Sequence, residues 1–197
     1  MERKRIFILD GHPARNTLSQ ALAAAYAEAA QAEGHEVRVA HLSDLVFDMD
    51  YEQAGYATSK PLEPALEQVM GDIEWCEHLV MVAPMWWGSL PAKLKGLFDR
   101  AFLPGRAFDT RNLSKIGMPA PMLGGRTARV IVTSDTPRWF LWLRYGSAMI
   151  RQIRGQILGF VGIKPARVSY FAGASHPKPG QVDRWLDRIG GLGARAE

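Results

Sequence analysis

The chain has 197 residues, of which 47% are hydrophobic and 22% are charged. These are ordinary values for a globular protein, and we expect residues 1–197 to form one domain with a sizeable core. The net charge of +4 is too small to predict binding to nucleic acid. No apolar run reaches about 18 residues, so no stable membrane insertion is expected. The lone Cys76 cannot form an internal disulfide, which favours a reducing, cytoplasmic location.

Strand-like and helix-like segments alternate along the chain. Short apolar runs predict strands over 5–10, 36–42, 79–83, 127–133 and 166–171. Helix-favouring composition, terminal glycines and a first-turn proline predict helices over 18–33, 61–76, 91–102, 138–160 and 181–189. Between and after these elements we expect long connections over 43–60 and 103–126 and a frayed tail over 190–197.

The alternation predicts an α/β fold, in which helices cover both faces of a five-stranded parallel sheet. We expect the strand order 2-1-3-4-5, with the second strand near one edge. In that order the carboxyl ends of the first and third strands border a crevice where ligands bind. The helical region 138–160 contains Gly146, a point at which it can break.

A polar loop follows the first predicted strand. It lacks the G-x-G-x-x-G pattern of dinucleotide-binding proteins and instead reads GHPARNTLS over residues 11–19. The hydroxyls of Thr17 and Ser19, together with free N–H groups at a helix start, suit a phosphate monoester. His12 and Arg15 could add donors. The simpler alternative is that Thr17 or Asn16 only caps the helix.

An aromatic loop follows the third predicted strand. It carries Trp86 and Trp87 between two prolines, at the carboxyl end of that strand. Both loops should meet at the same crevice, which predicts a site for a planar aromatic ligand with a phosphate tail. The alternative is that one tryptophan belongs to the core and the other makes a surface contact.

These loops also carry a resemblance to a known family. GHP at residues 11–13 and PMWWGSLPAKLKGLFDRAF at 84–102 resemble the flavodoxin-like NAD(P)H:quinone oxidoreductases, or DT-diaphorase family. The resemblance runs from about Arg5 to Gly162, with GFVGIKP before the last strand. It implies a flavodoxin-like fold, a non-covalent flavin, NAD(P)H as co-substrate, a quinone or similar acceptor, and a homodimer. The short C-terminal region favours FMN, with FAD as the alternative.

The resemblance also implies which residues hold the flavin. Its phosphate end would be bound by His12, Thr17, Leu18, Ser19 and Gln20. The isoalloxazine ring would be wrapped by Pro84, Met85, Trp86 and Trp87, partly through backbone N–H groups. A third wall would be formed by Thr133, Ser134, Asp135 and Thr136. The Tyr/His pair that assists hydride transfer in the vertebrate-type branch has no counterpart after the fourth strand, so no catalytic side chain is predicted.

Two functions fit this resemblance. The first is ping-pong transfer of two electrons from NAD(P)H through the flavin to the acceptor. The second is a flavin-binding regulatory subunit, for example of a transporter, with little turnover. An electron carrier of the flavodoxin kind is disfavoured, because such carriers are strongly acidic.

Two sets of arginines lie outside these loops. The aromatic, basic segment 138–154 is interpreted first as a lid or subunit interface, second as a core helix with a solvated face, and third as a membrane-contacting patch. Arg106 and Arg111 in the long connection are candidate nucleotide contacts.

Overall fold

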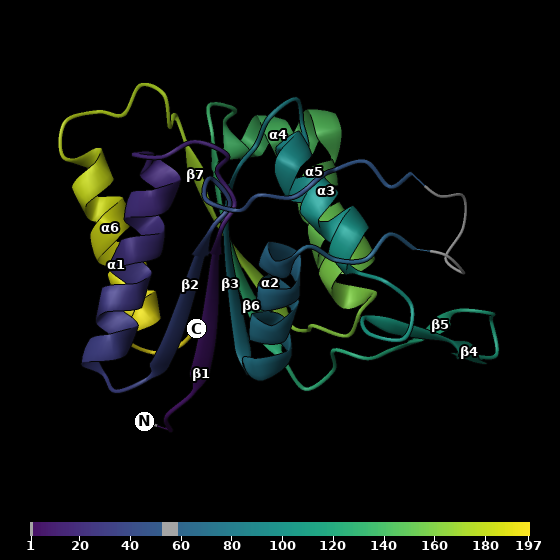
Figure 1. Cartoon of the computed structure of the whole chain (residues 1–197). Coiled ribbons are helices and arrows are strands. Elements are labelled where there is room, and N and C mark those ends of the chain that lie inside the picture. The colour runs from purple at the N-terminus through teal and green to yellow at the C-terminus, as the bar shows by residue number, and fades with distance from the viewer. Residues whose placement is uncertain (1, 53–58) are drawn as a thin grey trace.

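The centre of the fold is a five-stranded parallel sheet (Figure 1). Its strands are β1 (Arg5–Asp10), β2 (Glu36–His41), β3 (His78–Pro84), β6 (Thr127–Ser134) and β7 (Ala166–Ala172). They stand in the order β2-β1-β3-β6-β7, which confirms the predicted order and places the second strand at an edge. The computed structural model describes residues 2–52 and 59–197, so residues 53–58 of the connection expected over 43–60 lie outside the described residues.

The alternation of side chains along β1 explains how the sheet divides the core. Successive side chains of a strand point to opposite faces. Ile6 and Ile8 pack in the hydrophobic cluster that contains Leu22 of the first helix. Phe7 and Leu9 pack in the larger cluster on the other face. The apolar middle of β1 is therefore buried on both sides, as is typical of strands in parallel sheets.

Helices cover both faces of the sheet, as predicted (Figure 1). On one face lie α1 (Leu18–Ala32) and α6 (Gln181–Gly193). On the other face lie α2 (Pro64–Trp75), α3 (Ala92–Ala101), α4 (Arg138–Tyr145), α5 (Ala148–Arg151) and the π-helix η1 (Gln152–Gly159).

The connection expected over 103–126 contains secondary structure that the sequence did not predict. Strands β4 (Phe108–Leu113) and β5 (Pro119–Pro121) pair antiparallel as a separate two-stranded sheet. Its proline-rich second strand has none of the apolar alternation that predicts strands.

The helical region expected over 138–160 is divided into three segments. The break at Gly146 is confirmed, because this residue caps α4 in the left-handed conformation with φ of 55°. The following Ser147 has φ of 52°, so the chain changes direction before α5 begins. The last segment, η1, is a π-helix rather than a continuation of an α-helix.

The expectation of a frayed tail over 190–197 is wrong. Helix α6 continues to Gly193, and Leu192 and Ala196 are buried. Arg129 Nε donates a hydrogen bond of 2.9 Å to the backbone oxygen of Glu197. Glycines have a low helix propensity, which is why the sequence predicts an earlier end for this helix. In the structure Gly190 and Gly193 let α6 approach α1 closely, and the contacts between the two helices outweigh that low propensity.

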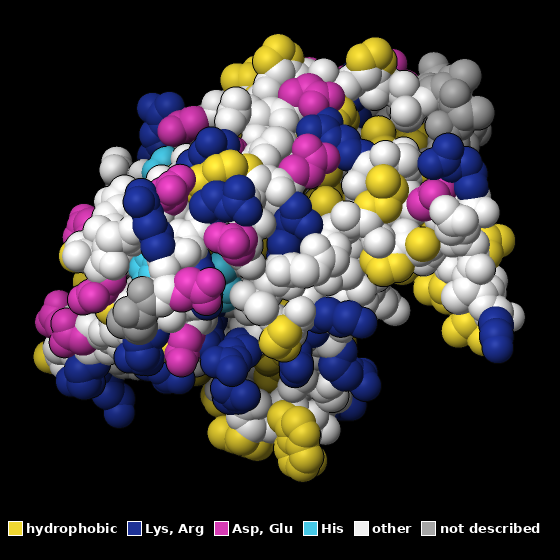
Figure 2. All heavy atoms as spheres, turned by 90° about the horizontal axis from the view of Figure 1, so that it is seen from below, with side chains coloured by type: hydrophobic (Ala, Val, Ile, Leu, Met, Phe, Trp, Pro, Cys, Tyr) yellow, Lys and Arg dark blue, Asp and Glu magenta, His cyan; other side chains and the backbone are white. Residues whose placement is uncertain are grey.

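Figure 2 views the molecule from below, from the side on which Figure 1 marks both chain ends. On the left of this view acidic and basic side chains are interspersed.

Among the described residues no helix has the length and apolar character needed to cross a membrane. The same part of the chain holds no group of three or more His, Cys, Asp and Glu residues that could bind a metal ion.

Candidate functional site

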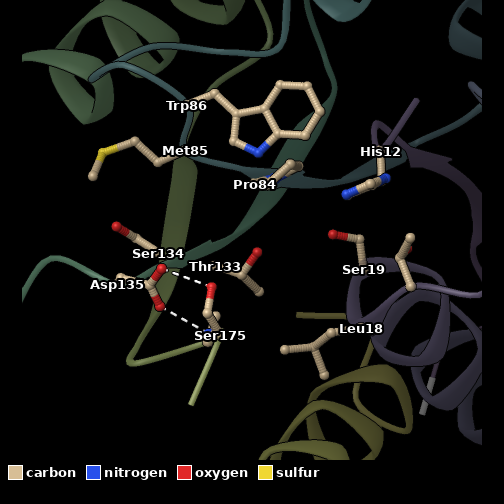
Figure 3. Close-up of a pocket in the computed structure, with 12 residues that line it drawn as sticks. His12, Leu18, Ser19, Pro84, Met85, Trp86, Thr133, Ser134, Asp135 and Ser175 are labelled. Carbon is tan, nitrogen blue, oxygen red and sulfur yellow. Dashed lines mark hydrogen bonds between the residues drawn. The ribbon is translucent and has the colours of Figure 1, made fainter. Parts of the chain in front are cut away.

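The carboxyl ends of four strands surround a cavity of about 190 Å³ (Figure 3). Loops after β1, β3, β6 and β7 contribute to its wall. It is lined by His12, Thr17, Leu18, Ser19, Pro84, Met85, Trp86, Thr133, Ser134, Asp135, Ala174 and Ser175. The predicted convergence of the polar loop and the aromatic loop is therefore present.

Gly11 brings the polar loop close to the neighbouring strand. Its N–H group donates a 2.7 Å hydrogen bond to the carbonyl of Val82. A Cβ at this position would lie 2.5 Å from Leu94 Cδ2 and 3.0 Å from the Val82 carbonyl oxygen, so a larger residue would force the Leu94 side chain or the loop to shift. The next residue, His12, packs edge-on against the Trp86 ring at 5.5 Å. The two loops are thus in direct contact at the wall of the cavity.

The start of α1 presents unpaired backbone donors to this cavity. Thr17 Oγ1 accepts a 3.2 Å hydrogen bond from the Gln20 N–H group, which confirms the capping role. The N–H groups of Leu18 and Ser19 precede the first intrahelical bond and find no acceptor among the described residues. The helix dipole adds partial positive charge at the same place. This end of the cavity therefore suits an anionic group.

The aromatic loop is a tight turn held by its own backbone. The N–H and C=O groups of Trp86 and Ser89 bond to each other at 3.0 and 2.9 Å. The two central residues, Trp87 and Gly88, have φ of 51° and 76°, so both are left-handed. The turn leaves the Trp87 side chain fully exposed, whereas Trp86 is 43% exposed and lines the cavity.

Hydrogen bonds within the protein limit which backbone N–H groups of this loop could bind a flavin ring. Met85 N–H donates to the Thr133 carbonyl at 2.8 Å, and Trp86 N–H donates to Ser89. Only the N–H groups of Trp87 and Gly88 lack an acceptor among the residues from Met85 to Ser89. Met85 and Trp86 therefore contribute side chains rather than backbone hydrogen-bond donors.

The third wall is anchored from the last strand. Asp135 accepts hydrogen bonds from the N–H and the hydroxyl of Ser175, at 2.8 and 2.7 Å (Figure 3). These two hydrogen bonds lower the pKa of Asp135 below its usual value, so the carboxylate is ionised at neutral pH. Thr136 accepts a 2.7 Å bond from the Tyr170 hydroxyl through its carbonyl. The loop after β6 is thus fixed at two points.

A second cavity of about 520 Å³ adjoins the first. The two cavities share Met85, Ser134 and Asp135. The remaining wall of the second cavity is formed by Trp87, Gly88, Thr136, Leu141, Tyr145, Ala148 and Met149. A ligand in the first cavity would therefore lie beside a larger space with a mostly apolar wall.

The structure does not bring every predicted residue to the first cavity. Trp87 and Thr136 line the second cavity instead. Gln20 lines neither of these two cavities, and its Oε1 accepts a 2.8 Å bond from the Asn16 N–H group, which holds the polar loop. Ala174 and Ser175 were missed. They follow the fifth predicted strand. Because the carboxyl ends of parallel strands meet at one edge of the sheet, the loop after this strand could have been expected at the cavity.

Three residues outside the polar loop and the aromatic loop are paired or buried within the protein. Arg106 forms ion pairs with Glu67 and Glu74, and Arg111 pairs with Asp109 at 3.0 Å. Neither arginine lines the first cavity, so their prediction as nucleotide contacts has no support in these contacts. Cys76 is a buried free thiol, and burial raises its pKa to about 11.

The sheet order and the position of the cavity are those of doubly wound proteins that bind ligands at the point where strand order reverses. Residues 4–190 match a protein family described as having a flavodoxin-like fold. The chain belongs to this flavodoxin-like family. The flavodoxin-like fold expected from the sequence is thereby confirmed.

Individual relatives of this flavodoxin-like chain carry related names. FMN-dependent NADH:quinone oxidoreductase 1 of Xanthomonas euvesicatoria pv. vesicatoria (strain 85-10) is 27% identical over 190 residues, covering 92% of this chain and 91% of that protein. The uncharacterized NAD(P)H oxidoreductase YcaK of Escherichia coli (strain K12) is 29% identical over 114 residues. That match covers 55% of this chain and only 57% of YcaK, so the chain spans about half the length of that relative.

A solved structure extends the likeness to the whole fold. The NAD(P)H:quinone oxidoreductase from Methanothermobacter marburgensis superposes with a TM-score of 0.80. The superposition covers 100% of both chains at 23% sequence identity. At this level of identity the likeness shows a common fold.

Proposed function

We propose that this protein is an FMN-dependent NAD(P)H oxidoreductase that passes two electrons to a quinone or similar acceptor in a ping-pong reaction. The observation that carries the proposal is the single cavity in which the start of α1 and the Trp86 loop meet. Its two ends differ in chemistry, with unpaired N–H donors at one and apolar side chains at the other. The Xanthomonas relative, named as FMN-dependent, aligns with 92% of the chain and supports the choice of cofactor.

The phosphate end of FMN fits the start of α1. The N–H groups of Leu18 and Ser19 would donate to phosphate oxygens, and the helix dipole would favour the negative charge. The Thr17 and Ser19 hydroxyls line the same end, and His12 closes it. Gln20 would act indirectly, through the Asn16 bond that shapes the loop.

The ring end fits the walls formed by the other two loops. Pro84, Met85 and Trp86 would provide one wall, and the residues from Thr133 to Asp135 would provide the next. Trp87 and Thr136 would border the ring from the adjoining cavity, where we expect the nicotinamide and the acceptor to bind in turn.

When bound, FMN supplies the hydride and electron chemistry, and the protein supplies position and electrostatics. The ionised Asp135 holds no proton to give, because both of its oxygens accept hydrogen bonds from Ser175. It acts by fixing the wall between the two cavities. Tyr145 is the phenol that lines the second cavity, and its hydroxyl could donate a hydrogen bond to an acceptor there.

Two further parts of the proposal concern the protein's setting. We expect a homodimer, as the family resemblance implies, and a cytoplasmic location. Light scattering would test the first, with twice the mass of one chain as the expected result. Fractionation of cells that express the protein would test the second.

The experiment that tests the proposal is oxidation of NADH and NADPH in the presence of a short-chain quinone. The purified protein is assayed after removal of its cofactor, with FMN, FAD or no flavin added. We expect turnover that requires flavin and is faster with FMN than with FAD. Bound flavin without turnover would instead indicate a regulatory subunit, and a protein that binds neither flavin would contradict the proposal.

A further inference from the structure

Helix α4 turns its apolar side chains toward solvent. Of its eight residues only Leu141 is buried. Trp139, Trp142 and Leu143 are 66%, 68% and 70% exposed. With 3.6 residues per turn and Leu141 facing the core, Trp139 and Leu143 lie on the opposite, outward side of the helix, and Trp142 lies beside them at about 100° from Leu141. An exposed stripe of this kind on a short helix marks an interaction surface.

Arginines flank this apolar stripe. Arg138 and Arg144 lie on the two sides of it, by the same helical spacing. The guanidinium of Arg151 reaches back to the end of α4, since a Cβ on Gly146 would lie 3.3 Å from its Nη2 atom. Within the described part of the chain, none of these three arginines forms an ion pair. We call the six residues Arg138, Trp139, Trp142, Leu143, Arg144 and Arg151 the α4 face.

The chain segment that carries the α4 face contains no acidic residue, although Asp135 immediately precedes it. Residues 136–182 include seven Lys and Arg and no Asp or Glu, although the chain has 20 acidic residues elsewhere. The net charge of +4 is therefore unevenly distributed, because this segment is strongly positive and the rest of the chain is slightly negative. A partner for this face must tolerate or offer negative charge.

We propose that the α4 face docks reversibly on the surface of an anionic lipid membrane. Tryptophan and leucine side chains enter the region between head groups and acyl chains, and flanking arginines are attracted to anionic head groups. The docking is peripheral and needs no spanning segment. A second copy of the chain fits less well, because a two-fold contact through this face would bring six arginines together without a carboxylate.

The α4 face adjoins the second cavity. Leu141 and Tyr145 of the same helix line that cavity, together with Trp87. If the proposed function holds, a docked molecule would have its acceptor cavity beside the bilayer, in which apolar quinones dissolve. The docking itself does not depend on flavin or on turnover, and binding measurements test it separately.

The test is co-sedimentation of the purified full chain with lipid vesicles. One set of vesicles contains phosphatidylcholine alone, and the other contains phosphatidylcholine with phosphatidylglycerol. We expect the protein to sediment with the anionic vesicles, to stay in solution with the neutral ones, and to dissociate as salt is raised. Bromine-labelled acyl chains should quench part of the tryptophan fluorescence only when the protein is bound.

Paired variants separate the α4 face from the rest of the surface. Arg144→Glu with Arg151→Glu should weaken binding by at least about tenfold, and Trp139→Ser with Leu143→Ser by a similar factor. The matched controls are Arg184→Glu on α6, at the other face of the sheet, and Ile116→Ser, an exposed apolar residue of the β4–β5 turn. Both controls should bind within about twofold of the unaltered chain, because neither residue belongs to the α4 face.

Three outcomes would overturn the proposal. The first is equal sedimentation with neutral and anionic vesicles, and the second is equal weakening by the controls. The third is a chain that ignores both kinds of vesicle and forms a dimer that Trp139→Ser with Leu143→Ser converts to a monomer. That result would show that a second copy covers the α4 face.

Discussion

The two ends of the central sheet are built from the same strands but use their polar groups differently. At the carboxyl end the N–H groups of Leu18 and Ser19 have no acceptor among the described residues. At the amino end a cavity of about 270 Å³ is also present, but its cations meet the chain's own oxygens. Arg167 and Arg195 pair with Glu197 at 3.8 and 3.6 Å. Unpaired N–H donors therefore face the cavity at the carboxyl end, whereas at the amino end the C-terminal segment pairs with the cations that line the cavity.

The two ends of the sheet should respond differently to substitution, one in stability and the other in ligand binding. Side chains at the amino end are held by tertiary contacts, so their loss should lower the free energy of unfolding. Loops at the carboxyl end sit on strands that are already paired, so changes there should act mainly on ligand affinity.

Gly193→Ala should give the largest loss of stability. A Cβ at this position would lie 2.3 Å from the Tyr26 carbonyl oxygen, so α6 and α1 must move apart. We expect the free energy of unfolding to fall by about 1–3 kcal/mol in urea denaturation. Affinity for FMN should not change in the folded molecules.

The control for this prediction is Gly191→Ala in the same helix. Its Cβ would lie 3.7 Å from the flexible Arg195 side chain, which is an ordinary contact. It should raise stability by roughly 0.5–1 kcal/mol through helix propensity. Equal urea midpoints for the two variants would show that the tail does not pack against α1.

His78 should make the folded state sensitive to acid. It is 2% exposed, and burial lowers its pKa from 6.5 to about 3. As pH is lowered, His78 is therefore protonated near pH 6.5 in the unfolded chain but only near pH 3 in the folded chain. Protonation favours the unfolded state between these values, so the free energy of unfolding falls as pH is lowered through that window. For one group the slope is at most about 1.4 kcal/mol per pH unit.

Urea unfolding between about pH 6.5 and 5 measures this effect, because carboxylates remain ionised over that range. His78→Gln should flatten the dependence, and His176→Gln, at an exposed position, should leave it unchanged. A dependence that survives in His78→Gln would assign it to another group.

Trp86→Ala should act on binding rather than on stability. Trp86 lines the first cavity and contacts His12, whereas Trp87 lines only the second. Loss of an aromatic wall is expected to cost about 1.4 kcal/mol, or about tenfold in FMN affinity. Quenching of FMN fluorescence measures it, and Trp87→Ala should remain within about twofold. The reverse order of effects would move the ring to the second cavity.

Thr17→Ala should have the smallest effect and should touch both properties. It removes the cap of α1 and one hydroxyl of the anion-binding end, at a cost of about 1 kcal/mol in stability. FMN affinity should fall severalfold. Thr17→Ser keeps the oxygen and should restore both, whereas failure of Ser to restore FMN affinity would argue against a phosphate contact by the hydroxyl.

Much of the site could be predicted because its residues carry local signals. The polar loop before Leu18 and the proline-flanked Trp86 and Trp87 each interrupt an element with residues that suit a ligand. Strand alternation then places both loops at one edge of the sheet. Ten of the thirteen predicted residues line the first cavity for this reason.

Other features could not be predicted because they depend on contacts between distant segments. The packing of α6 to Gly193 depends on the close approach of α1, which no local pattern encodes. The β4–β5 pair forms from residues of low strand propensity. The outward apolar side of α4 follows from the direction in which Leu141 docks, and an aromatic helix is equally compatible with a core position.

FMN binding is tested most directly by the visible absorption spectrum of the purified protein, followed by identification of the cofactor released on denaturation. We expect a yellow protein that releases FMN, or a colourless one that binds added FMN and becomes yellow. A colourless protein that takes up neither FMN nor FAD would contradict it, and the cavity at the carboxyl ends of the strands would then belong to a different ligand.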